Sequence, residues 1–378
     1  MRILYGVVGE GMGHATRSVV VLDHLAGSGH EIRVVVSGRA HDFLKERFSG
    51  REDVAIEEIQ GLTLRYFGNK LDRAGSLFRN LKEAPKGIQK NVKVYRKVAE
   101  EGFRPDLVVS DFESFAALYG LSRGIPVVSI DNIQALNRLE HEKSIRKGKG
   151  FDYRLARLAV KMKVPRAYHY LISSFFFPPV RKKFTTLVPP ILRPEVLQAR
   201  REPGEHVLVY LRAVPERDLV RMLRKLPLPV RVYGADKERT VDNVSLRKFS
   251  AQDFLDDLRT AKAVIGGGGF SLMSEAVSLR VPMLAVPIER QYEQELNARY
   301  LEKLGYGSWE RKLGLRPIRS FLDRVPEFEE SLKSYEPRDN TMLFACLDEL
   351  VERVKKKKKR PARLDTRAMG SYPEKSAS

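Results

Sequence analysis

A group of polar side chains follows Pro287, and its composition is that of a ligand site rather than of an ordinary connection. The group consists of Glu289, Arg290, Gln291, Glu293, Gln294 and Asn297. Carboxylates accept, and amides both donate and accept, the hydrogen bonds that hydroxyl groups make. This group therefore predicts contact with a hydroxylated ligand.

Four consecutive glycines, Gly266 to Gly269, stand shortly before this polar group and end a short apolar strand pattern at 263–265. Because glycine has no Cβ atom, a ligand can approach the backbone N–H groups that open the next helix, where anions are favoured. We expect a phosphate to be bound by Gly267, Gly268, Gly269, Phe270 and Ser271. A phosphate part beside a hydroxylated part is the shape of a sugar nucleotide.

His14 stands directly after a second glycine-rich segment, Gly9 to Gly13, at the expected start of a helix. A helix N-terminus disfavours imidazolium, so the ring would stay neutral and could accept a proton from a hydroxyl group. Asp111 ends a buried strand pattern of the same predicted sheet, where it could hold the other ring nitrogen. The alternative is that His14 only caps or packs against the glycine turn.

Both candidate sites need parallel β-sheets to position them. Strand and helix patterns alternate from Arg2 to Ile130 and again from His206 to Leu304, which is typical of doubly wound α/β domains. In such domains ligands bind at the carboxyl ends of the strands, where both glycine segments fall. Neither segment has the GxGxxG spacing of dinucleotide-binding domains.

The segment Val188–Pro194 contains three prolines, which interrupt regular structure, and it is the best candidate for a linker. We expect an N-terminal domain over residues 1–188 and a second domain over residues 189–354, closed by a helix at 340–354. Residues 355–378 are rich in lysine and arginine and poor in apolar side chains, so they predict a disordered basic tail.

The composition narrows the class of protein. The formal net charge is +20, so we expect an anionic partner such as nucleic acid, an acidic lipid surface or a phosphorylated substrate. The single cysteine, Cys346, excludes an internal disulfide and fits the cytoplasm. No run approaches the ~20 apolar residues of a membrane span. The N-terminus lacks the pattern of a signal peptide.

Four segments of the chain are similar to a known family: GEGMGHATR at 9–17, VVSDFESFAALYG at 108–120, KFSAQDFL at 248–255 and the stretch from Ala263 to Asn297. In these segments the chain resembles the GT-B nucleotide-sugar glycosyltransferases, close to the UDP-glycosyltransferases and the peptidoglycan N-acetylglucosaminyltransferase. The resemblance implies an α/β fold of two Rossmann-like, doubly wound domains that face each other across a cleft, with a C-terminal helix before the basic tail.

The resemblance also implies roles for individual residues. His14 corresponds to the base that acts on the acceptor hydroxyl, and Asp111 to the aspartate that pairs with this histidine. The residues implied at the donor are Phe249 and Gln252 for the nucleobase, Glu275 for the ribose, and Glu293 and Gln294 for the sugar. Many relatives place a histidine or arginine against the diphosphate where this chain has Gly267. Backbone N–H groups, Ser271 or Arg212 would then supply that contact.

The implied function is inverting, metal-independent transfer of a hexose or N-acetylhexosamine from a UDP-sugar to a hydroxyl acceptor, without a cofactor. The acceptor would bind the N-terminal domain, where two segments mix apolar or aromatic side chains with basic ones: Ser76–Glu101, expected to be helical but interrupted at Pro85, and Phe175–Lys183. Such a surface suits a lipid-linked, cell-envelope acceptor at the inner face of the plasma membrane. The alternative is a packed helix with a solvated basic face.

Two other functions stay open. The same fold would support a reaction like that of a UDP-N-acetylhexosamine 2-epimerase, on the free nucleotide sugar. A non-catalytic protein would instead bind nucleic acid or a membrane surface through its basic residues, including the Lys355–Arg360 run. No segment resembles a nucleic-acid-binding module, which ranks this third function last.

Overall fold

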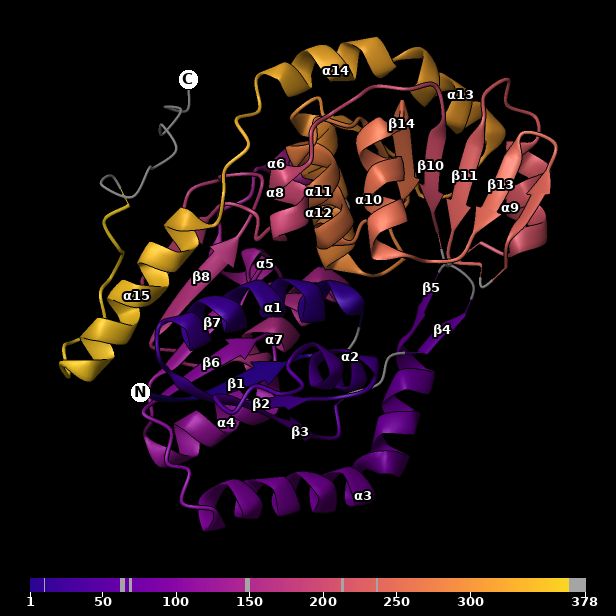
Figure 1. Ribbon diagram of the computed structural model, residues 1–378. Coiled ribbons are helices and arrows are strands. Elements are labelled where there is room, and N and C mark those ends of the chain that lie inside the picture. Colours follow the sequence, from indigo (N-terminus) through magenta and orange to yellow (C-terminus); the bar gives the residue numbers. More distant parts are fainter. Residues whose placement is uncertain are drawn as a thin grey trace. The chain divides into compact units, whose positions relative to one another are not determined.

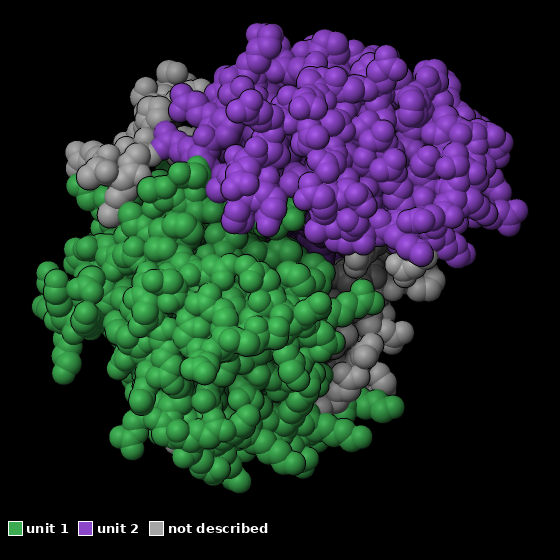
Figure 2. Space-filling view, viewed as in Figure 1, with its two compact units in different colours: residues 1–63, 76–193, 339–378 green, residues 64–75, 194–338 purple. Residues whose placement is uncertain are grey.

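The computed structural model describes residues 1–9, 11–61, 65–67, 70–146, 150–211, 214–235 and 237–366. The chain divides into two compact units: unit 1 comprises residues 1–63, 76–193 and 339–378, and unit 2 comprises residues 64–75 and 194–338 (Figure 2). Each unit is built on one seven-stranded sheet with helices packed on it (Figure 1). The prediction of two Rossmann-like α/β domains is confirmed.

The sheet of unit 1 has the strand order β3-β2-β1-β6-β7-β8-β9, and all neighbouring strands are parallel. Its strands are β1 (Arg2–Val7), β2 (Glu31–Val36), β3 (Val54–Glu58), β6 (Leu107–Asp111), β7 (Val127–Asp131), β8 (His169–Ser173) and β9 (Thr185–Val188). Strands β2 and β3 are added on one side of β1, and strands β6 to β9 on its other side. The point at which the strand order reverses, the switch point, therefore lies between β1 and β6. Ligands bind at such points in α/β sheets.

Alternate residues of β1 serve the two faces of this sheet, as the period of a strand requires. Ile3 and Tyr5 pack in one core cluster with α1 and α15, whereas Leu4 packs in another with side chains of α3 and α4. The helices of this part of the chain are α1 (Met12–Gly27), α2 (Arg39–Arg47), α3 (Arg73–Glu100), α4 (Ser114–Arg123), α5 (Ala135–Arg138), α6 (Lys143–Arg146), α7 (Phe151–Lys163) and α15 (Thr341–Lys355). Helix α3 continues through Pro85, where we expected an interruption, because a proline removes one helical hydrogen bond without requiring the helix to end.

The C-terminal helix α15 belongs to unit 1, whereas we expected it to close the second domain. Leu343, Cys346 and Leu347 are fully buried in the same core cluster as Ile3 and the apolar face of α1. The ring of Phe344 stacks on His24 with centroids 4.1 Å apart. Helix α15 therefore belongs to unit 1 because its apolar face packs on the first sheet, although it follows unit 2 in the sequence.

The segment after α15 also differs from the expected disordered tail at 355–378. Residues 356–366 lie against unit 1: the Phe184 N–H donates to the Ala362 carbonyl at 2.6 Å, and Leu364 is only 4% exposed. Hydrogen bonds from Phe184 and Tyr168, together with the buried side chain of Leu364, thus hold this segment beside β9. Residues 367–378 lie outside the described residues.

The sheet of unit 2 has the order β12-β13-β11-β10-β14-β15-β16, with β12 antiparallel to β13 and the other pairs parallel. Its strands are β10 (Val207–Tyr210), β11 (Val230–Tyr233), β12 (Arg239–Val241), β13 (Val244–Arg247), β14 (Ala263–Gly266), β15 (Met283–Ala285) and β16 (Gly307–Trp309). A separate hairpin joins β4 (Arg65–Phe67) to β5 (Lys70–Asp72). The switch point of the large sheet lies between β10 and β14.

Helices cover both faces of this second sheet. They are α8 (Pro194–Gln198), α9 (Glu216–Leu223), α10 (Ala251–Thr260), α11 (Phe270–Ser278), α12 (Tyr292–Lys303), α13 (Leu315–Asp323) and α14 (Val325–Lys333). Side chains of α9, α13 and α14 share a core cluster with β10 and β11, and α10 and α11 cover the opposite face (Figure 1). In the described part of the chain, no helix is both long and apolar enough to cross a membrane.

Candidate active site

His14 and Asp111 meet at the switch point of unit 1. Strand β1 ends at Val7, which pairs with Asp111 at the end of β6, and the chain then turns into α1. His14 Nδ1 lies 2.8 Å from Asp111 Oδ1. The side chain of Asp111 is 1% exposed and that of His14 is 16% exposed. The carboxylate is therefore buried, whereas part of the imidazole ring is accessible to solvent.

Arg17, one helical turn after His14, completes this group and was not among the predicted site residues. Its Nε donates to Asp111 Oδ2 at 2.8 Å, its Nη1 donates to Asn132 Oδ1 at 2.8 Å, and its Nη2 contacts Asp111 Oδ1. The guanidinium is 6% exposed. An arginine three positions after the histidine shares its helix face, which is the signal in GEGMGHATR that could have pointed to it.

The charge of Arg17 decides the ionisation of Asp111. Burial opposes the charged form, but the positive charge of Arg17, the charge of His14 and hydrogen bonds from both outweigh it and lower the pKa of Asp111 to about 2. A bidentate guanidinium–carboxylate contact is among the strongest pairings a buried carboxylate can have. Asp111 is therefore a carboxylate at any physiological pH.

Nδ1 of His14 has two charged neighbours. It lies 2.8 Å from Asp111 Oδ1 and 2.6 Å from Arg17 Nη2, and an arginine only donates. The contact with Asp111 calls for a proton on Nδ1, whereas the contact with Arg17 calls for Nδ1 to accept. The first of these two tautomers leaves Nε2 able to accept a proton.

A second buried carboxylate lies on the neighbouring strand. Asp131 ends β7, accepts hydrogen bonds from the Gln134 N–H at 2.7 Å and the Ser129 hydroxyl at 2.8 Å, and is 1% exposed. Burial raises its pKa to about 6, although these hydrogen bonds and Arg17 act in the opposite direction. The pKa values of the two aspartates at one edge of the sheet thus differ, because only Asp111 is in direct contact with the guanidinium.

In unit 2 the glycine segment is held from behind by α12. Asn297 Nδ2 donates to the Gly268 carbonyl at 3.2 Å and to Glu293 Oε1 at 3.3 Å. A Cβ atom at Gly268 would lie 2.6 Å from the Gln294 carbonyl oxygen, so this position must be glycine for the helix to pack so closely. The polar group after Pro287 therefore supports the turn.

Gln294 is partly committed to this support. Its Oε1 accepts the Ile288 N–H at 2.9 Å, so only its amide NH₂ could address a ligand. Glu293 stands one residue earlier on α12, with a carboxylate oxygen that accepts from Asn297. The adjacent Arg290 has φ of 69°, a left-handed backbone that is rare for a side chain of this kind and concentrates at binding sites.

Helix α11 begins at the glycine segment without a side-chain cap. Phe270 is its first residue and is buried, so its contribution to a ligand would be its backbone N–H. Ser271 and Glu275 are half-buried and one turn apart on the same face. The first two turns of α11 can therefore present N–H groups, a hydroxyl and a carboxylate together.

An aromatic group marks the other end of this edge. Phe249 follows β13 and is 58% exposed, with ring centroids 6.2 Å from Tyr210 and 6.4 Å from Tyr233, which end β10 and β11. An exposed aromatic ring supported by two others is a suitable platform for a flat base. Gln252 lies on α10 and donates to Asp256 Oδ2 at 3.0 Å, and Arg212 lies outside the described residues.

Comparison with known proteins agrees with this geometry. Residues 1–326 match the family model described as glycosyl transferase family 1. A glycosyltransferase of Methanosarcina acetivorans is 26% identical over 81% of this chain and 85% of its own length. A relative from Methanosarcina mazei is 25% identical over 81% of this chain and 85% of its own.

Solved structures share the fold. A UDP-glucosyltransferase from Polygonum tinctorium that glucosylates indoxyl has a TM-score of 0.67 at 13% identity, covering 94% of this chain and 98% of its own. LpCGTa, solved with UDP, has a TM-score of 0.65 at 14% identity over 93% and 99%. Given two Rossmann-like units of the GT-B type and a family match over most of its length, the chain belongs to glycosyl transferase family 1 and is a glycosyltransferase.

Proposed function

We propose that the protein is an inverting glycosyltransferase that moves a hexose or N-acetylhexosamine from a UDP-sugar to an acceptor hydroxyl. The observation that carries the proposal is the contact between His14 Nδ1 and the buried Asp111 carboxylate, which leaves Nε2 as the base. The plant UDP-glucosyltransferase and the UDP complex among the similar structures support the choice of nucleotide.

In the proposed reaction, His14 Nε2 takes the proton of the acceptor hydroxyl while the acceptor oxygen forms its bond to the anomeric carbon. The bond from that carbon to the diphosphate oxygen breaks in the same step, so UDP leaves and the configuration inverts. Asp111 stabilises the imidazolium that His14 becomes, as a buried carboxylate does in other histidine bases. Arg17 keeps Asp111 ionised and in position.

Unit 2 would bind the donor. Phe249 offers an apolar face to the nucleobase, Glu275 accepts hydrogen bonds from the ribose hydroxyls, and Glu293 and Gln294 contact the sugar. The N–H groups that begin α11, with Ser271 and Arg212 as further donors, would stabilise the leaving diphosphate. This scheme requires no metal ion, so transfer should continue when EDTA is present.

A finer form of the proposal places the protein in the cytoplasm, at the inner face of the plasma membrane, with a lipid-linked acceptor of the cell envelope. Helix α3 exposes Ile88 and Val92 among its lysines and arginines, which suits an anionic surface. Phe175 and Phe176 do not contribute, because both are buried, in contrast to the aromatic surface we expected there. A lipid-linked acceptor should then be used better than the same acceptor without its lipid.

His14→Ala tests the proposed function. We expect sugar transfer to be abolished while UDP binding, measured by calorimetry, stays at the wild-type affinity, since the proposed UDP contacts belong to unit 2. His30→Ala, just before the amino end of β2, is the matched control and should keep its activity. Wild-type turnover by His14→Ala would refute the base. Interconversion of a free UDP-sugar without an acceptor would favour the 2-epimerase-like alternative.

A further inference from the structure

Unit 1 contains a hollow, which we call the basic cavity, at the edge of the sheet opposite to His14. Its lining includes Ala167 and Tyr170 around the start of β8 and Phe184 immediately before β9, so it lies at the amino ends of these strands. All strands of this sheet are parallel, and His14 and Asp111 stand at their carboxyl ends. The cavity has a volume of about 440 Å³, the size of a metabolite site.

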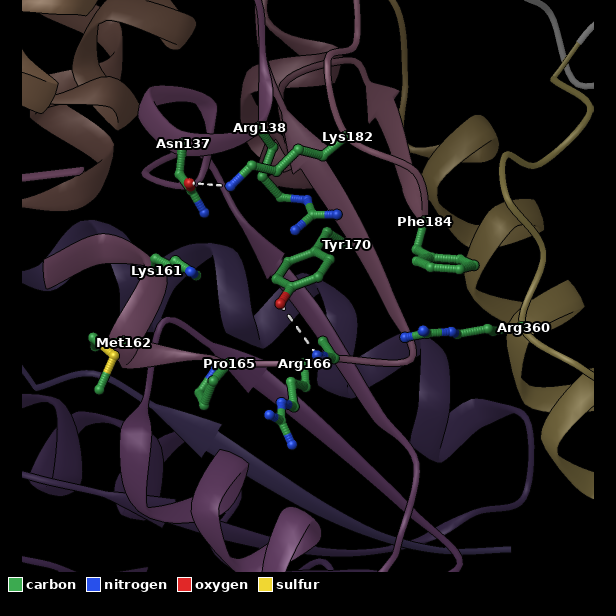
Figure 3. Close-up of a pocket in the computed structure, with 11 residues that line it drawn as sticks. Asn137, Arg138, Lys161, Met162, Pro165, Arg166, Tyr170, Lys182, Phe184 and Arg360 are labelled. Atoms are coloured by element: carbon green, nitrogen blue, oxygen red, sulfur yellow. Dashed lines mark hydrogen bonds between the residues drawn. The ribbon is translucent and has the colours of Figure 1, made fainter. Parts of the chain in front are cut away.

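Five cationic side chains surround this cavity: Arg138, Lys161, Arg166, Lys182 and Arg360. Figure 3 shows them arranged around the ring of Tyr170. No carboxylate lines the cavity, and within the described part of the chain no ion pair joins any of the five to an acid. A half-enclosed group of like charges without a counter-charge attracts an anion.

The cation nearest the cavity floor is held rigidly. Arg138 is 7% exposed, its Nε donates to the Thr185 hydroxyl at 2.7 Å, and its Nη2 donates to the Lys183 carbonyl at 2.5 Å. Its guanidinium lies 3.6 Å from the centroid of the Tyr170 ring. These neutral partners fix its direction, and the charge of Asp131 acts on it only from outside the cavity lining, so a preorganised cation faces the cavity.

Lys182 also has a neutral hydrogen-bond partner and no acid beside it in the cavity lining. Its Nζ donates to Asn137 Oδ1 at 2.5 Å. Burial, followed by repulsion from Arg181, Arg138, Arg157 and Lys161, lowers its pKa to about 8. A bound anion would reverse the repulsive part of this shift.

The backbone around the cavity is strained in two places. Arg166 has φ of 50° and Phe184 has φ of 62°, both in the left-handed region that disfavours residues with side chains. The Arg360 guanidinium lies 3.7 Å from the centroid of the Phe184 ring, so the segment after α15 supplies one wall. Strained residues persist where the surrounding structure holds them for a purpose, often at a ligand site.

We propose that the basic cavity binds the phosphate or diphosphate group of an anionic ligand, at a site separate from His14 and from the proposed donor site. A phosphate ligand has several oxygens and more than one negative charge, so it matches this group of guanidinium and ammonium side chains better than a ligand with a single carboxylate would. The phosphate could come from a soluble compound or from a lipid headgroup. Helix α7 lines the cavity with Met162 and also exposes Leu155 and Leu158, so the lipid source is tested separately.

Calorimetry of the full chain with inorganic pyrophosphate tests the proposal, with UDP present in excess to occupy the donor site. We expect one binding event that weakens at least tenfold in the double variant Arg166→Gln, Lys182→Met. The double variant Arg104→Gln, Lys45→Met loses the same charge from exposed positions of unit 1 and should bind as the wild type does. Binding should also weaken as the pH rises past 8, where Lys182 loses its proton.

A sedimentation arm uses phosphatidylcholine vesicles with and without phosphatidylglycerol. Binding to the anionic vesicles that pyrophosphate competes away, and that the Arg166→Gln, Lys182→Met variant loses, identifies a lipid headgroup as the source. Pyrophosphate binding without vesicle binding identifies a soluble phosphate compound. Absence of both, or equal weakening in the two double variants, overturns the proposal. His14→Ala should leave every one of these results unchanged, which separates them from the test of the proposed function.

Discussion

In unit 1 the turn after β1 leads to a buried group of charged side chains, whereas in unit 2 the turn after β14 leads to glycines with no charge of their own. Both turns lie at the switch point of a parallel sheet. Arg17 and Asp111 fix the first through side-chain contacts, and Asn297 fixes the second by holding the Gly268 carbonyl. Moving a proton requires a side chain with a controlled charge, while binding a diphosphate needs only well-placed N–H groups.

The largest effect should come from breaking the charged group. Asp111→Asn would leave Arg17 without its carboxylate and remove the acceptor that orients His14. We expect kcat to fall by roughly 10³- to 10⁴-fold, as for a base that has lost its aspartate, with UDP affinity unchanged. Steady-state kinetics with Asp106→Asn, an exposed control, measures this. A loss below tenfold would mean that His14 does not depend on Asp111.

Breaking the backbone turn should have a smaller effect and should act on the donor. In Gly268→Ala the new Cβ would lie 2.6 Å from the Gln294 carbonyl oxygen, so α12 must move. Overpacking of this kind costs about 1–3 kcal/mol of stability. We expect the free energy of UDP binding to weaken by a comparable amount. Gly269→Ala is the matched control, since nothing lies within 4 Å of its added Cβ. Equal affinities in the two variants would contradict this reading of the turn.

The exposed ring of Phe249 allows the proposed nucleobase contact in unit 2 to be tested by itself. Phe249→Ala should weaken UDP binding by about 1–3 kcal/mol, the usual range for a base stacked on an aromatic ring. Because Phe249 is 58% exposed, the thermal midpoint should change little. Phe254→Ala, which removes a buried ring that supports Phe249, should instead lower the midpoint. The proposed position of the nucleobase fails if Phe249→Ala binds UDP like the wild type.

The smallest effect concerns Asp131, whose pKa is raised from 3.8 to about 6 by burial. A carboxyl group with a raised folded pKa stabilises the fold below its unfolded pKa and loses that contribution as the pH rises through 6. Asp131→Asn stays neutral, so it should be more stable than the wild type at pH 8, where Asp131 is charged, and should gain nothing at pH 4. Urea unfolding at the two pH values checks this, and a gain of equal size at both would exclude titration as its cause.

Local patterns in the sequence were sufficient for much of the fold. The apolar runs at β1, β6 and β14 predicted strands, and the glycine segments that follow these runs at β1 and β14 predicted turns at their carboxyl ends. His14 and Asp111, 97 positions apart, were expected at one site because both follow strands of one parallel sheet, and the structure brings them to 2.8 Å. The edge strands β9, β12 and β16 were not predicted, since their sequences TTLV, RTV and GSW lack the run of apolar residues that marks the buried strands.

The sequence by itself thus determined the two α/β units, the glycine turns and the pairing of a histidine with an aspartate, because each depends on neighbouring residues or on strand direction. The tertiary structure decided the rest. Arg17 became part of the site only when β6 placed Asp111 beside it, and α15 joined unit 1 because its apolar face fits the first sheet. The basic cavity unites Arg138, Lys182 and Arg360, whose shared position depends on packing between segments that are distant in the chain.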